Sequence, residues 1–179
     1  MRTFVGLFAA AALLVPAAMI VSQPAGAAGG TTCAKGGGSA TFTPPLPKLG
    51  DPTKVKDVLK SKGTLSGCTG AVKSASITGV SPKSTGSNCT TISNPKAAPT
   101  KVTLTVKWNA GAASTVAGQL SVIKGKPVTN QAFTGKITKG QFVGKTVAGK
   151  IVYKIPSGQC VSKPLSNVTY TDSGSFAIK

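Results

Sequence analysis

Residues that could carry acid–base or metal chemistry are scarce in this sequence. Its 179 residues include no histidine and three acidic side chains, Asp51, Asp57 and Asp172. Without histidine, the chain cannot build a Ser-His-Asp or Cys-His nucleophile, or a zinc site with histidine ligands. The aspartates do not form the D-x-D-x-D type of loop that binds calcium. We therefore expect no catalytic residue, no metal and no cofactor, and a protein that is not an enzyme.

Two short motifs resemble nucleotide-binding or catalytic signatures but lack the remaining parts of them. Gly144–Thr146 matches the end of a phosphate-binding loop, yet Lys139 occupies the position where that loop needs its first glycine. Ser121 and Lys124 have the S-x-x-K spacing of a serine nucleophile and its lysine base. They lie in a stretch with strand periodicity, where positions three apart point to opposite faces. Neither motif predicts an active site.

Positive charge is the strongest functional signal. The chain has 21 Lys and Arg residues against 3 acids, a formal charge of +18, and Arg2 is its one arginine. Ammonium groups favour diffuse, salt-sensitive contact with a polyanion over bidentate phosphate recognition. We therefore predict weak binding to an anionic cell-wall polymer or membrane surface, and no specific nucleic acid. A second interpretation, in which the lysines keep the surface soluble and protect sheet edges, stays open. The lysines expected to contact the polyanion are Lys101, Lys107, Lys136, Lys145, Lys150 and Lys154.

The N-terminus has the layout of a secretory signal peptide. Arg2 precedes an apolar run from Phe4 to Val21, and Ser22–Ala27 ends in small residues that suit cleavage. An uncleaved membrane anchor is the alternative, because the run just reaches the length of a membrane span. We expect cleavage and a secreted, extracellular protein.

Four cysteines follow the predicted cleavage site. In an oxidising compartment an even number of cysteines indicates disulfides, here two, and the spacing does not suit a metal or redox site. Four cysteines permit three pairings. The local pair Cys68–Cys89 is preferred, which leaves Cys33 with Cys160.

The hydrophobic pattern has mostly the period of two that is typical of strands. In the stretch Lys101–Trp108, apolar residues at even positions alternate with Lys and Thr, which predicts one dry and one wet face and places Trp108 in the core. Short strands separated by turn signals predict an all-β fold, an antiparallel β-sandwich or a barrel-like variant of it. The segment 52–62 fits either a helix that Asp51 caps or a strand. Further strands are expected at 39–43, 71–80, 115–123, 128–138, 142–155 and 168–178.

These patterns divide the chain into three parts. We expect residues 1–27 to be the signal peptide, 28–38 a flexible N-terminal segment that includes Cys33, and 39–179 a single β-domain.

Four segments in combination resemble a group of small exported actinobacterial proteins. They are Cys33 followed by Phe42–Leu46, then Gly63–Cys68, Trp108–Thr115 and Gly135–Gly144. In that group they correspond to F-x-P-P-L, G-x-L-x-G-C, W-x-x-G-x-x-S-T and G-x-V-x-x-G-x-F-x-G segments. The resemblance implies a secreted β-rich fold with four structural cysteines, and it carries over no catalytic residues.

The sequence as a whole favours a secreted, non-catalytic protein held at the cell envelope by diffuse lysine charge. A secreted hydrolase that uses Lys or Asp is one alternative. A protein-binding effector or inhibitor is the other, and it would need a contiguous exposed apolar patch.

Overall fold

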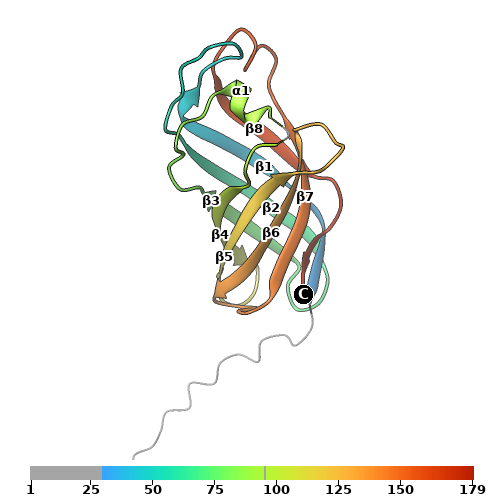
Figure 1. The fold of residues 1–179 in the computed structure, drawn as a ribbon. Helices are drawn as coiled ribbons and strands as arrows, with labels where there is room; N and C mark the ends of the chain where they lie inside the picture. Colours follow the sequence, from blue (N-terminus) through green and yellow to red (C-terminus); the bar gives the residue numbers. More distant parts are fainter. Residues whose placement is uncertain (1–29, 95) are drawn as a thin grey trace, which may run out of the picture.

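The protein is an antiparallel β-barrel in the computed structural model, which describes residues 30–94 and 96–179 (Figure 1). The predicted signal peptide, residues 1–27, lies outside the described residues. The elements are β1 (Thr31–Leu46), β2 (Val58–Cys68), β3 (Ser74–Val80), α1 (Cys89–Ile92), β4 (Thr100–Trp108), β5 (Ser114–Val122), β6 (Asn130–Lys139), β7 (Thr146–Lys154), β8 (Leu165–Asp172) and β9 (Phe176–Ile178).

Eight strands close into a ring. Strands β2 to β8 follow one another around the barrel in chain order, and β1 closes it by pairing with both β8 and β2. The short β9 pairs with β1 and β7 just beyond the end of β8. The predicted all-β antiparallel fold with two disulfides is confirmed, and its form is the closed barrel.

The alternation predicted for 101–108 appears in β4 as expected. Alternate side chains from Val102 to Trp108 are buried inside the barrel, whereas Lys101 and Lys107 are exposed. Neighbouring strands repeat this pattern in register, because Leu104 pairs with Gly79 of β3 and Val116 of β5. Apolar burial on the inner face is therefore the main force that closes the barrel.

One end of the barrel is plugged by aromatic side chains. Trp108 is 7 % exposed and contacts Phe142 edge-on, with ring centroids 5.3 Å apart. Its indole Nε1 donates a hydrogen bond to Ser114 Oγ at 2.9 Å, and Ser114 Oγ donates to the backbone oxygen of Gln141. Every polar group of the Trp108–Ser114 pair is thus satisfied inside the plug, as buried polar groups require.

The expected disulfide pairing is wrong. Cys33 is bonded to Cys68, and Cys89 is bonded to Cys160. The first bridge joins directly paired residues of β1 and β2, and the second joins the α1 segment to the connection after β7. Sequence proximity favoured Cys68–Cys89, but the β3 strand carries the chain to the opposite end of the barrel between these two residues.

The first strand also begins earlier than expected. Residues 31–38, assigned to a flexible segment, form the first half of β1, and Thr31–Cys33 pair with β9. Cys33 is fully buried.

The segment 52–62, for which the sequence allowed either a helix or a strand, is a loop followed by a strand. β2 begins at Val58, and the residues before it form a connection in which Asp51 accepts a hydrogen bond from the Thr53 N–H at 2.9 Å. Asp51 therefore holds a local turn of the kind typical of aspartate. This bond lowers the pKa of the Asp51 carboxyl.

Candidate ligand cavity at the open end

The second end of the barrel is covered by loops instead of a plug. The connections 47–57, 81–94 with 96–99, 123–129 and 155–164 gather there together with α1, at the upper end of the molecule in Figure 1. In an up-and-down barrel alternate connections fall at the same end, so the topology itself brings these four segments together.

The α1 segment is anchored on three sides. Asn88 accepts a hydrogen bond from the Thr91 N–H at 2.9 Å, and Thr91 Oγ1 is bonded to Asn88 in return, which caps the helix. The Asn88 side-chain amide donates to the backbone oxygens of Asp51 and Thr53. With the Cys89–Cys160 bridge, these contacts fix α1 over the barrel.

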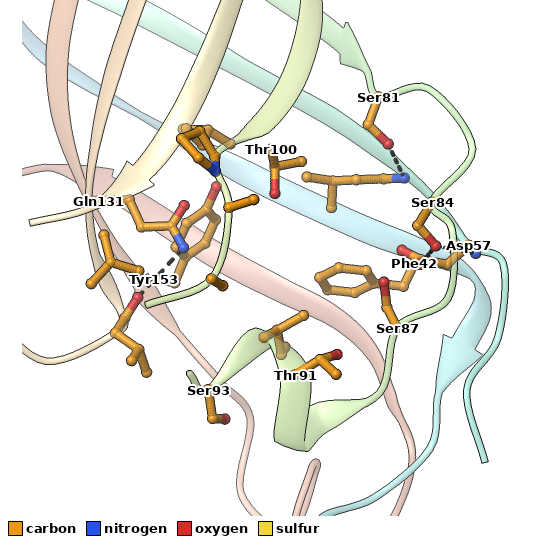
Figure 2. Close-up of a pocket in the computed structure, with 18 of the residues that line it drawn as sticks. Phe42, Asp57, Ser81, Ser84, Ser87, Thr91, Ser93, Thr100, Gln131 and Tyr153 are labelled. Atoms are coloured by element: carbon orange, nitrogen blue, oxygen red, sulfur yellow. Dashed lines mark hydrogen bonds between the residues drawn. The ribbon is translucent and has the colours of Figure 1, made fainter. Parts of the chain in front are cut away.

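A cavity of about 550 Å³ opens between α1, its flanking loop and the inner barrel wall. Most of its wall is apolar and comes from inward-facing strand residues and from residues 92–93 and 97–99 (Figure 2). Figure 2 shows Thr91 and Ser93 on the helix side and Gln131 and Tyr153 on the barrel wall. The principal apolar lining residues are Phe42, Leu59, Ile92, Leu120, Tyr153 and Val168.

The single carboxylate of this wall is already bonded. Asp57 is 5 % exposed, and its side chain accepts a hydrogen bond from Ser84 Oγ. The same hydroxyl accepts from the Asp57 backbone N–H at 3.0 Å. Ser84 therefore fixes the loop against β2, and its proton is engaged in that structural contact.

The wall carries further polar groups. The hydroxyls of Tyr153 and Thr100 belong to it. Burial raises the pKa of the Tyr153 hydroxyl, so it stays protonated at neutral pH and can donate. These groups could orient a bound molecule, as a few polar groups do in pockets that are mostly apolar.

A smaller cavity of about 70 Å³ lies deeper in the barrel and shares Leu59, Leu120 and Tyr153 with the large one. Tyr170 lines it and contacts Tyr153 edge-on, with ring centroids 6.0 Å apart. The Tyr170 hydroxyl donates to the backbone oxygen of Lys62 at 3.2 Å. Burial, with a contribution from Asp172, raises the pKa of Tyr170 to about 12.

Asp172 lies at the same depth. Its Oδ2 atom is buried, with no hydrogen-bond partner among the described residues, and burial raises the pKa of the carboxyl. A side chain at Gly36 would collide with this oxygen, because an added Cβ would lie 2.0 Å from it. The glycine thus makes room for a carboxyl group inside the barrel.

Six lysines predicted to bind a polyanion do not converge on one site. Five are exposed, of which Lys101 also belongs to the edge of the large cavity, and the sixth, Lys145, is partly buried in the turn after β6. The five occupy β4, β6 and β7 and are Lys101, Lys107, Lys136, Lys150 and Lys154.

The chemical motifs noted in the sequence are also dispersed. Asp51 lies in a loop, Asp57 in the wall of the large cavity and Asp172 deep in the barrel. Ser121 is on β5, whereas Lys124 is in the following connection. Residues 30–94 and 96–179 contain no group of three or more His, Cys, Asp or Glu side chains that could hold a metal ion. In the same residues, no helix has the length and apolarity needed to cross a membrane.

Comparison with known proteins gives no match: no family model, no curated protein and no solved structure is significantly similar to this chain. The resemblance to small exported actinobacterial proteins therefore stays a prediction.

Sequence reasoning missed the cavity, and the inward glycines of the strands do not mark it. They lie where a neighbouring side chain or backbone atom already occupies the place of a Cβ, and none of them belongs to the lining of the large cavity. Strand glycines mark places where another group approaches closely. The inward glycines are Gly36, Gly38, Gly63, Gly79, Gly118, Gly135 and Gly149.

Proposed function

We propose that this protein is an exported, non-catalytic binding protein that holds one small, mainly apolar molecule in the open half of its barrel. The observation that carries the proposal is the cavity of about 550 Å³ beneath α1. An eight-stranded barrel is wide enough either to be filled by side chains or to hold one small ligand. Apolar pockets of a few hundred Å³ with a few polar groups are the usual form of ligand sites.

The two disulfides support an oxidising compartment as the working environment. That the protein is secreted, and that it attaches to the cell wall, are parts of what we propose.

The neutral fluorophore N-phenyl-1-naphthylamine tests this function, since its emission rises on entering an apolar site. We expect saturable enhancement with the oxidised protein, and competition by an apolar alcohol such as dodecan-1-ol. Absence of saturable enhancement in folded protein would overturn the proposal.

A second candidate function rests on the outer wall of the barrel. Asp57 is buried and Asp172 lies partly buried in the barrel, so Asp51 is the acid left near the 20 lysines of the surface. This uncompensated charge supports weak attachment to anionic envelope polymers. Retention on isolated cell-wall sacculi should fall steeply between about 50 and 500 mM salt, because the screening length shortens over that range. Retention that ignores salt would exclude this mode of attachment.

A further inference from the structure

Both ends of the barrel carry lysines, and the open end has more of them because its connections are longer. The connections at the open end contain eight lysines, all exposed, whereas the shorter turns 69–73, 109–113, 140–145 and 173–175 at the plugged end contain Lys73 and Lys145. Against these eight, the open-end connections contain two acids, Asp51 and Asp57. The eight lysines are Lys48, Lys54, Lys56, Lys83, Lys96, Lys124, Lys126 and Lys163.

Three lysines lie next to the cavity itself. Lys83 and Lys101 belong to its lining, and Lys54 lies against Gly86, another lining residue, with its Cβ 3.3 Å from the place of an added Gly86 Cβ. One carboxylate, that of the buried Asp57, lies in the same wall, so the three lysines leave a net positive charge around the cavity. The long, flexible side chains of these lysines can therefore reach the head group of a molecule that enters the cavity.

The deep part of the barrel has the opposite character. Its wall is mostly apolar, and its one charged group is the carboxyl of Asp172. An anionic group at this depth would lose its hydration and face a like charge, and both effects are unfavourable. A ligand with one anionic and one apolar end therefore has one favourable orientation, with its charge at the mouth.

Building on the proposed binding function, we propose that the ligand is an amphipathic anion, with its hydrocarbon part inside the barrel and its carboxylate or phosphate among Lys54, Lys83 and Lys101. At about 30 Å³ for each water-sized group, the cavity of about 550 Å³ accommodates on the order of 15 to 20 non-hydrogen atoms. This size fits a medium-length fatty acid or alkyl phosphate.

Displacement of bound N-phenyl-1-naphthylamine tests this inference. We compare dodecanoate, dodecyl phosphate, dodecan-1-ol and dodecylammonium, which share one chain length and differ in charge. The anions should displace the fluorophore at about five- to tenfold lower concentration than the alcohol, and dodecylammonium should be the weakest. A tenfold difference in concentration corresponds to about 1.4 kcal/mol of binding free energy. A few exposed charge contacts contribute an energy of this size. The better of the two anions identifies the head group.

A matched pair of variants locates the effect. Lys54→Gln/Lys83→Gln/Lys101→Gln should remove most of the preference for the anions while binding of the neutral fluorophore persists. Lys73→Gln/Lys139→Gln/Lys179→Gln removes the same charge at the plugged end, and its preference should match the wild type.

The outcomes separate the two proposals. Fluorophore binding without a preference for anions, or with equal loss of preference in both variants, would overturn the amphipathic-anion inference and leave the binding function standing. No fluorophore binding at all would overturn the binding function itself.

Discussion

The two ends of this barrel are built from the same strands and yet differ in every property that matters for binding. At the plugged end Trp108, Phe142, Ile137 and Ile178 are each buried in one apolar cluster. At the open end, large inward residues such as Phe42 and Tyr153 line a space of about 550 Å³ that loops and α1 cover. The difference shows that one end of the same barrel is packed as core, whereas its covered end keeps room for a ligand.

Tyr170 and its neighbours mark the boundary between the halves. The ring crosses the interior where β1 and β2 carry Gly38 and Gly63, and an added Cβ at Gly63 would lie 2.5 Å from the Tyr170 hydroxyl. Below this level the core is packed by large apolar side chains. Above it, a second apolar cluster around Leu46 and Leu165 packs beside the cavity, and α1 and the loops cover it.

The largest effect should come from breaking the plug. Trp108→Ala removes a buried indole and leaves Ser114 without its donor, so we expect the free energy of unfolding to fall by about 3–5 kcal/mol in a urea titration. The protein that stays folded should still bind N-phenyl-1-naphthylamine with wild-type affinity. Loss of binding in the folded fraction would mean that the ends are not separate.

Removal of either disulfide should cost about 2–4 kcal/mol of unfolding free energy, with the larger loss for Cys89–Cys160 because it spans 71 residues against 35 for Cys33–Cys68. The two double Cys→Ala variants should differ in binding. Cys89→Ala/Cys160→Ala frees the α1 segment and should weaken fluorophore binding severalfold, whereas Cys33→Ala/Cys68→Ala should leave it unchanged. Equal effects on affinity would contradict the role assigned to the α1 segment.

Filling the cavity should affect binding without affecting the fold. Thr100 lines the cavity at the start of β4, and Thr100→Trp should reduce fluorophore affinity about tenfold, or about 1.4 kcal/mol, because the indole occupies the ligand space. Thr103→Trp places the same ring on the outer face of the same strand and serves as the control. Identical affinities in the two variants would argue for binding outside the barrel.

The smallest effect concerns Asp172. Burial raises the pKa of the Asp172 carboxyl in the folded state above its pKa in the unfolded chain. Below the unfolded-state pKa the carboxyl is protonated in both states and does not change the free energy of unfolding. As the pH rises from there through the folded-state pKa, the free energy of unfolding falls. Asp172→Asn should therefore increase the free energy of unfolding near pH 7, by on the order of 0.5 kcal/mol since solvent partly screens the group. The increase should vanish near pH 3. A variant less stable than the wild type at neutral pH would show that the charged carboxylate has an unseen partner.

Much of the fold could be predicted from the sequence because strand alternation is local. The pattern of 101–108 gave β4 and its buried face correctly, and most other strands were expected within a few residues. Barrel closure could not be predicted in the same way, since it depends on pairing between β1 and the distant β8. The disulfide pairing failed for the same reason: Cys33 and Cys68 meet only because β1 lies beside β2.

The candidate site was harder to predict than the fold. Its wall combines inward residues from several strands with a four-residue helix, and a helix that short leaves no periodic signal. Tyr153 and Tyr170 were noted as aromatic side chains but not as lining of one interior. The lysines of the loops were visible in the sequence, yet their gathering at one end follows only from the order of the strands.

The most direct test of the account is a nitrogen–proton NMR titration of the oxidised protein with N-phenyl-1-naphthylamine. Trp108 is the single tryptophan, so its indole signal reports on the plugged end alone. The account predicts saturable shifts of the Leu59, Leu120 and Tyr153 amides and an unmoved Trp108 indole signal. Shifts confined to the plugged end, or to exposed strand residues such as Lys107 and Lys136, would contradict it.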